Sequence, residues 1–182
     1  MFEWIKGLRK AAAPVRRVRS RDDGADAERV ELAEFAPGIL PFLGLTAYLQ
    51  LEMYEAATRG VSGAATLQAK DGLARVAGQT LSKHQRLTAE LRKRGEEPHI
   101  VMAPFARVID EYVERIETSD WHQHVLSLYL VGGLFDDFFA TLAGGLRDSY
   151  RTEAISILRD DTGRDELKAL LEEALAADEA LS

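Results

Sequence analysis

The segment LARVAGQTLSKHQRLTAEL, residues 73–91, carries the clearest structural signal in this sequence. Its inward positions recur every three or four residues, which is the spacing of one face of an α-helix. The residues on that face are Leu73, Ala77, Leu81, His84, Thr88 and Leu91. Basic residues at 92–94 and then Gly95 provide a favourable helix end. We therefore predict one long helix over residues 64–94.

Three other stretches are long and apolar enough to be helices that pack against this one. They cover residues 39–59, 121–146 and 148–177. We expect a turn at residues 60–63, a bend near Gly163, and an N-cap at Thr118, Ser119 or Asp120 for the third long helix. Prolines 98 and 104 mark a crossover after the second helix, with a shorter helix at residues 104–117.

No stretch alternates between apolar and polar residues as a half-buried strand would. The sequence therefore predicts an all-α fold, a four-helix bundle in which a long crossover with a short extra helix joins the second and third long helices. We expect the bundle to cover residues 31–182. Residues 1–30 are expected to be a basic N-terminal arm and linker, partly disordered.

The 182 residues carry a net charge of −7, and this charge is unevenly distributed. Residues 1–21 have a net charge of +6 with Glu3 as their one acidic residue, so the remainder carries −13. The basic residues of the arm are Lys6, Arg9, Lys10, Arg16, Arg17, Arg19 and Arg21. Such an arm is typical of a surface that binds RNA, an anionic membrane or an acidic protein, and equally of a solvated tail.

The sequence contains no cysteine, which excludes disulfides, thiolate metal sites and cysteine nucleophiles. The most apolar part of the first predicted helix, residues 39–51, is too short to span a bilayer. The arm also lacks the continuous apolar stretch of a signal peptide. We therefore expect a cytoplasmic protein without a transmembrane segment.

Polar residues interrupt the apolar faces of all four predicted long helices. They are Gln50, His84, Asp136, Asp137, Asp161 and Arg164. A carboxylate inside a bundle must be paired, protonated or bound to metal, because its lost hydration outweighs what packing returns. Di-iron bundles satisfy this need with two Glu and two Glu-x-x-His motifs.

The di-iron motif is incomplete in this sequence. Leu81 stands three residues before His84, where the motif requires an acid, and Arg164 stands three residues after Asp161, where it requires histidine. A guanidinium has no lone pair for a metal. We therefore predict that Arg164, with His84 nearby, compensates Asp161 and either Asp136 or Asp137, and that no metal cofactor is needed.

Four short motifs resemble a known family. They are PGILPFLGLTAY (37–48), MAPF (102–105), SDW (119–121) and DTG (161–163). Together they are similar to actinobacterial ferritin-like proteins related to the tRNA hydroxylase that acts on 2-methylthio-N6-isopentenyladenosine. This resemblance covers roughly residues 31–180 and implies a di-iron monooxygenase ancestry.

The resemblance also implies roles for individual residues. His84 matches the histidine of the second helix, Asp161 the acid of the fourth, and Asp136 or Asp137 lies near the acid of the third. Gln50, Leu81 and Arg164 stand where the family has an acid, a glutamate and a histidine. The resemblance therefore implies an eroded di-iron site.

Two functions follow as hypotheses. The favoured one is a non-catalytic ferritin-like bundle that binds a partner, as a homodimer through an exposed helix pair, with the arm reaching RNA or an acidic protein partner. The alternative is a hydroxylase-like monooxygenase of the tRNA-modifying type, in which iron is held at an atypical site. Its candidate ligands are Glu55, His84, Asp137 and Asp161.

Overall fold

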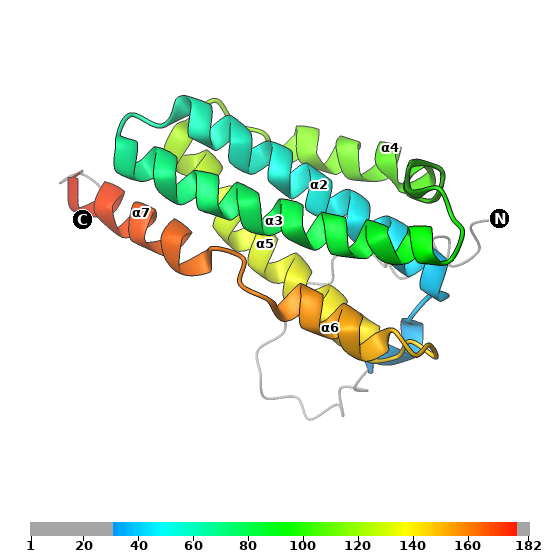
Figure 1. Ribbon diagram of the computed structural model, residues 1–182. Helices are drawn as coiled ribbons and strands as arrows, with labels where there is room; N and C mark the ends of the chain where they lie inside the picture. The colour runs from blue at the N-terminus through cyan, green and yellow to red at the C-terminus, as the bar shows by residue number, and fades with distance from the viewer. Residues whose placement is uncertain (1–30, 178–182) are drawn as a thin grey trace, which may run out of the picture. The chain divides into compact units, whose positions relative to one another are not determined.

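The computed structural model describes residues 31–177, and these residues form helices with no strand among them (Figure 1). The elements are the 3₁₀ helix η1 (Leu32–Phe35) and the α-helices α2 (Ile39–Gly63), α3 (Leu67–Lys93), α4 (Pro98–Ile116), α5 (Trp121–Ala143), α6 (Arg151–Arg159) and α7 (Arg164–Ala177). The predicted all-α fold is confirmed. The predicted arm, residues 1–30, lies outside the described residues.

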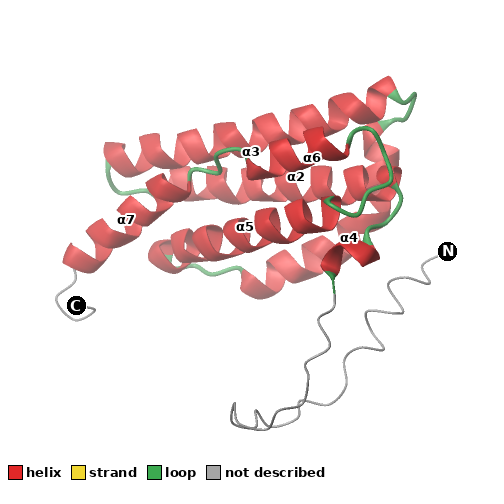
Figure 2. Cartoon of the chain, turned by 90° about the horizontal axis from the view of Figure 1, so that it is seen from below, coloured by secondary structure: helices red, strands yellow, loops and turns green. Residues whose placement is uncertain are grey.

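Helices α2 and α3 run side by side over their whole length, and α5 packs against α2 (Figures 1 and 2). The fourth position of the bundle is shared by α6 and α7, which both pack against α5 and α3. Helix α4 is the crossover and lies along α2. The bundle therefore has the predicted connectivity, with a broken fourth helix.

The turn predicted at residues 60–63 is wrong, because α2 continues to Gly63. Gly60 is buried, and a Cβ there would lie 3.3 Å from Cδ1 of Leu73. The carbonyl oxygen of Gly60 also accepts a 2.9 Å hydrogen bond from the indole of Trp121. Gly60 therefore allows close packing in the interior of α2 and does not end the helix. Helix α3 begins after Thr66, whose side chain caps it.

The crossover helix is longer than predicted. It begins at Pro98, which suits the first turn because proline has no N–H to leave unpaired, and it continues through Pro104. The ring of Pro104 deprives the carbonyl of Ile100 of its helical partner. Both residues are exposed, so water can bond that carbonyl and the helix persists. The predicted N-cap of α5 is confirmed, and of the three candidates it is Asp120, whose carboxylate accepts a 2.8 Å bond from the backbone N–H of Gln123.

The predicted fourth helix is two helices, and the bend expected near Gly163 is a complete break. Gly163 has φ of +69°, a left-handed conformation that glycine adopts readily. Its N–H donates to Oδ1 of Asp161 at 2.9 Å, which closes a local turn. Gly163 also leaves room for Val76, whose Cγ2 would lie 2.5 Å from a Cβ. This break decides where Asp161 and Arg164 lie.

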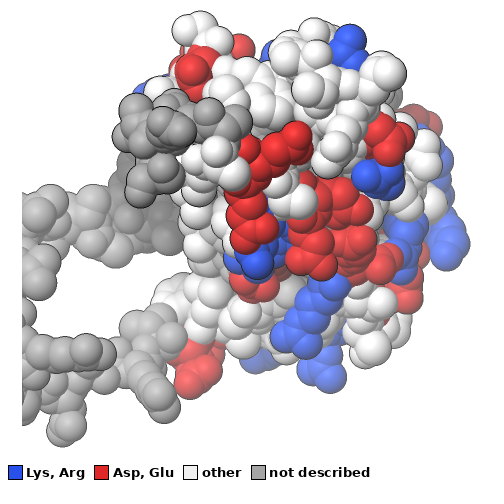
Figure 3. Space-filling model, turned by 90° about the vertical axis from the view of Figure 1, so that its left-hand side faces the viewer, with Lys and Arg blue, Asp and Glu red and all other residues white. Residues whose placement is uncertain are grey.

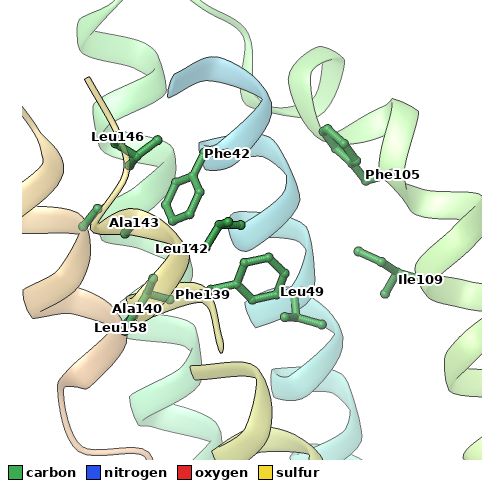
Figure 4. Close-up of a cluster of buried hydrophobic side chains, with 11 residues drawn as sticks. Phe42, Leu49, Phe105, Ile109, Phe139, Ala140, Leu142, Ala143, Leu146 and Leu158 are labelled. Carbon is green, nitrogen blue, oxygen red and sulfur yellow. The ribbon is translucent and has the colours of Figure 1, made fainter. Parts of the chain in front are cut away.

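The apolar core extends along the bundle in several clusters of buried side chains. Figure 4 shows the cluster in which Phe42 of α2 meets Phe139 of α5, with ring centroids 6.4 Å apart. Side chains of α4 and α6, among them Phe105 and Leu158, complete it. Phe139 is therefore part of the core.

Helix α5 is the one described helix that is long and apolar enough to cross a membrane by length and composition. Of its most apolar 18-residue window, 39% is buried inside the bundle. A core helix of a soluble protein meets the same criterion, so the absence of a transmembrane segment stays a prediction.

Candidate functional site

A buried ion pair lies at the centre of the bundle. Nζ of Lys83, on α3, is 2.8 Å from Oδ2 of Asp136, on α5. The same ammonium donates a second bond, of 3.2 Å, to the carbonyl oxygen of Leu158 on α6. Lys83 is 2% exposed and Asp136 is 8% exposed. The pair thus ties three helices together in a place with little access to water.

Gln50 of α2 completes this polar cluster. Its Nε2 donates a 2.8 Å hydrogen bond to Oδ1 of Asp136, so both carboxylate oxygens have a donor. Its own Oε1 is buried and has no hydrogen-bond partner within residues 31–177. We refer to Gln50, Lys83 and Asp136 as the central cluster.

The electrostatics of Asp136 combine opposing effects. Burial raises the pKa of this carboxyl, whereas the charge and the hydrogen bond of Lys83 and the bond from Gln50 oppose that rise. The net direction is upward. A carboxylate in this position therefore depends on its neighbouring ammonium for its charged form.

The sequence places Lys83 inward through a second regular stripe on α3. Leu73, Val76, Thr80, Lys83, Leu87 and Leu91 follow one another at intervals of three or four residues, and all are buried. The inward stripe that we predicted has His84 where the buried stripe has Lys83, so the prediction is shifted by one residue at this turn of α3. Val76 and Leu87 could have indicated that Lys83 faces inward, because both are apolar and lie on the same face of the helix.

His84 is half-buried and lies outside the central cluster. Its Nδ1 is 2.8 Å from the carbonyl oxygen of Ala47 on α2. A carbonyl only accepts, so Nδ1–H is the donor. This bond anchors α3 to α2 and fixes Nδ1 as the ring nitrogen that carries a proton.

Arg164 does not compensate the predicted acids, which corrects our expectation. It is exposed at the start of α7, where its guanidinium carbon lies 5.4 Å from the ring centroid of Tyr129 on α5. Asp161 is also exposed, and its carboxylate accepts a 2.7 Å bond from Nε2 of Gln79. The physical reason is the break at Gly163, which puts Asp161 in a loop and Arg164 at the rim of the bundle.

The remaining predicted residues are surface groups. Asp137 follows Asp136 directly on α5, so it points away from the cluster and is exposed. Glu55 is exposed on α2, with a carboxylate oxygen 3.9 Å from a guanidinium nitrogen of Arg59. Of the six residues of the predicted cluster, Gln50 and Asp136 are hydrogen-bonded to each other, and Arg164 lines a small pocket beside them without an ion pair to Asp136.

The residues at the centre do not fit a di-iron group. A di-iron centre takes several carboxylates and histidines, whereas the central cluster has one carboxylate, one amide and an ammonium. The ammonium has no lone pair and would repel a metal ion beside Asp136. The quartet Glu55, His84, Asp137 and Asp161 is not brought together, and the part of the chain that the structure describes holds no group of three or more histidines and acids arranged for a metal.

A second feature of the molecule is an apolar cleft between α2, α4 and α5, with a volume of about 50 Å³. Its walls include Met53, Tyr112 and Phe135, and the rings of Tyr112 and Phe135 meet edge to face at 5.7 Å. Glu52 lies at its polar side, and burial raises the pKa of this carboxyl. The cleft is too small for an organic cofactor, so it adds an apolar recess to the surface of α4 and α5.

The outer face of α5 is the largest exposed run of apolar side chains on one described helix. Leu126, Leu130, Leu134 and Phe138 are between 40% and 64% exposed. Their four-residue spacing places them on one side of the helix. We refer to these four residues as the α5 stripe.

The sequence was compared with known families and proteins. The model of a family described as a ferritin-like domain of actinomycetes matches residues 33–182. The match spans all the described helices except the first residue of η1. No curated protein matches the chain.

Proposed function

The chain belongs to the ferritin-like domain family of actinomycetes, and we propose that it is a member without di-iron chemistry that acts by binding a partner. The observation that carries this proposal is the 2.8 Å contact between Lys83 and Asp136. The bundle interior contains its own cation, bonded to the one acid of the central cluster. The kinship with tRNA hydroxylases inferred from the four sequence motifs then reflects ancestry, with no metal cofactor retained.

The proposed partner is RNA, and the proposed contact is the basic arm. Seven Lys and Arg residues among the first 21 give this segment the charge that phosphate backbones attract. The rest of the chain is acidic, and Figure 3 shows acidic side chains gathered at the end of the bundle where α2 is joined to α3. Such a surface repels phosphate, so the arm is the part suited to RNA. A cytoplasmic location is part of this proposal.

Metal analysis tests the loss of di-iron chemistry. The full chain is expressed with iron supplied and purified without chelators, and its iron content and its absorption spectrum are measured. We expect far less than one iron per chain and no oxo-bridged band. Stoichiometric iron with such a band would contradict the proposal and favour the hydroxylase alternative.

RNA binding is tested separately with single-stranded RNA at several salt concentrations. Replacing the seven basic arm residues by Gln should remove most of the affinity, together with a dependence on salt that has a slope of about −0.7 per phosphate contacted. The matched control replaces by Gln seven exposed basic residues of the described helices and should leave the affinity unchanged; they are Lys70, Lys93, Arg107, Arg115, Arg151, Arg159 and Lys168. Equal affinity for the arm variant and the wild type would exclude the arm as the RNA contact.

A further inference from the structure

We propose that the α5 stripe is the interface with a second copy of this chain, in an antiparallel pairing of the two α5 helices. The inference goes beyond the proposed function and is independent of it, because it uses neither the central cluster nor the arm. It begins from the exposure of Leu126, Leu130, Leu134 and Phe138. Single exposed leucines are common on protein surfaces, but a contiguous row of four large apolar side chains marks an interaction site.

Residues 31–177 of one chain leave this row uncovered. Helix α5 buries its other faces against α2, α6 and α7, and Gly132 and Gly133 allow close contact with Met53 and Arg164. Figure 2 shows α5 lying open along the face seen from below, with α4 on one side and α6 and α7 on the other. No element within residues 31–177 lies over the α5 stripe, and a second copy of the chain seated on it would remove it from water.

The charge pattern of α5 favours an apolar partner of the same kind. Residues 121–135 contain no Lys, Arg, Asp or Glu. Asp136 is neutralised inside the bundle by Lys83, which leaves Asp137 as the exposed acid of the helix. Along the α5 stripe itself a basic or acidic partner has almost no complementary charge to bind, whereas a second α5 stripe buries no unpaired ion at the centre of the contact.

The spacing of the α5 stripe makes it self-complementary. The four side chains are evenly spaced at four residues, so the row is symmetric about the point between Leu130 and Leu134. A two-fold axis through that point places Leu130 against Leu134 of the partner subunit and Leu126 against Phe138 of the partner subunit. Rows at four-residue spacing from two helices interdigitate best at a crossing angle of about −50°.

The available area is sufficient for a stable dimer. The 23 residues of α5 span about 34 Å. Helix α4 adds the exposed Val108 and Tyr112 beside it, and Tyr112 contacts Phe135. Two helices side by side present a face of roughly 34 by 20 Å, or about 700 Å². Stable interfaces bury about 800 Å² on each partner, which is close to this value.

The experiment is analytical ultracentrifugation of the full chain at micromolar concentrations, with and without Leu130→Glu and Leu134→Glu together. We expect a dimer for the wild type and a monomer for the variant, with dimer dissociation constants at least 100-fold apart. The control is Leu67→Glu, which alters an 85% exposed leucine at the start of α3 and should leave the dimer intact. Circular dichroism checks that both variants keep their helices, as expected for exposed positions.

Disulfide cross-linking tests the register, because the sequence contains no cysteine of its own. A mixture of Leu130→Cys and Leu134→Cys chains should form heterodimeric disulfides faster than a mixture of Leu126→Cys and Leu130→Cys chains. A monomeric wild type, a dimer that survives the double glutamate variant, or equal cross-linking in both mixtures would overturn the proposal. A monomeric wild type that binds phosphatidylcholine vesicles through the α5 stripe would assign this face to a membrane and would also overturn it.

Discussion

Lys83 and Asp136 form an ion pair between α3 and α5, with Nζ and Oδ2 2.8 Å apart and both side chains almost fully buried. Removing two charges from water is costly, and their attraction compensates only when the remaining donors and acceptors are also bonded. Here Leu158 and Gln50 supply those bonds. The ammonium of Lys83 therefore supplies the counter-charge that the buried carboxylate of Asp136 needs.

The first prediction concerns Lys83. Lys83→Met leaves the carboxylate of Asp136 buried without its counter-ion, and we expect the free energy of unfolding to fall by about 3 to 5 kcal/mol at neutral pH. Urea denaturation measures this change. The control is Lys93→Met at the exposed end of the same helix, which should cost less than about 0.5 kcal/mol. Equal effects of the two substitutions would contradict a buried role for Lys83.

The second prediction concerns Arg164. Because this side chain is exposed and its main contact is with the ring of Tyr129, Arg164→Leu should change the free energy of unfolding by about 1 kcal/mol or less. The same denaturation measurement applies. A loss as large as that of Lys83→Met would show that the guanidinium compensates buried acids after all.

The third prediction is a pH dependence at Asp148. Bonds from the guanidinium of Arg94, at 2.8 and 2.9 Å, and from the backbone N–H of Tyr150 lower the pKa of this carboxyl below its ordinary value of 3.8. A lowered folded-state pKa stabilises the protein above 3.8, and this contribution is lost as the pH falls through the folded-state pKa.

Asp148→Asn should therefore cost stability at neutral pH, and the difference from the wild type should shrink on acidification below about 3.8. Thermal unfolding at a series of pH values measures it. In an Arg94→Leu background, most of the effect of Asp148→Asn at neutral pH should disappear, because the guanidinium is its main cause. A difference that does not vary with pH in the wild-type background would refute the linkage.

The fourth prediction concerns the contact between α2 and α4. A Cβ on Gly44 would lie 2.5 Å from the carbonyl oxygen of Val101, so Gly44→Ala must push α4 away and should cost about 1 to 3 kcal/mol. Gly78→Ala is the matched control, since nothing lies within 4 Å of its Cβ position, and it should stabilise α3 by about 0.5 to 1 kcal/mol. Stabilisation by both substitutions would mean that α4 packs less closely than described.

The helical fold was predictable because the apolar spacing of α3 is regular over many turns and the segments of α2 and α5 are long and apolar. The ends of the helices were less predictable, because glycine and proline can either end a helix or lie inside one. Gly60 allows close packing within α2, and Pro104 lies inside α4, yet both were interpreted as boundaries. At Gly163 the opposite occurred, because a left-handed residue breaks a helix completely where a bend was expected.

The central cluster was predictable in part. Gln50 and the adjacent Asp136 and Asp137 interrupt strongly apolar surroundings, so the sequence predicted an inward Gln50 and one inward aspartate but left open which of the two it was. Lys83 was missed because a lysine is seldom fully buried and because the adjacent His84 has the chemistry of a metal ligand. Neighbouring side chains of an α-helix point about 100° apart. An error of one residue in the predicted inward face therefore puts His84 inside in place of Lys83. The α5 stripe was indistinguishable from core, since α5 is apolar on nearly every side.

The most direct test of the central claim is a double-mutant cycle on Lys83 and Asp136. We would measure the free energy of unfolding of Lys83→Met, of Asp136→Leu and of the double variant. If the ammonium exists to neutralise this carboxylate, each single substitution should cost several kcal/mol, and the double variant should lie within about 1 kcal/mol of the wild type. If the two losses simply add, Lys83 is not the built-in cation of this bundle.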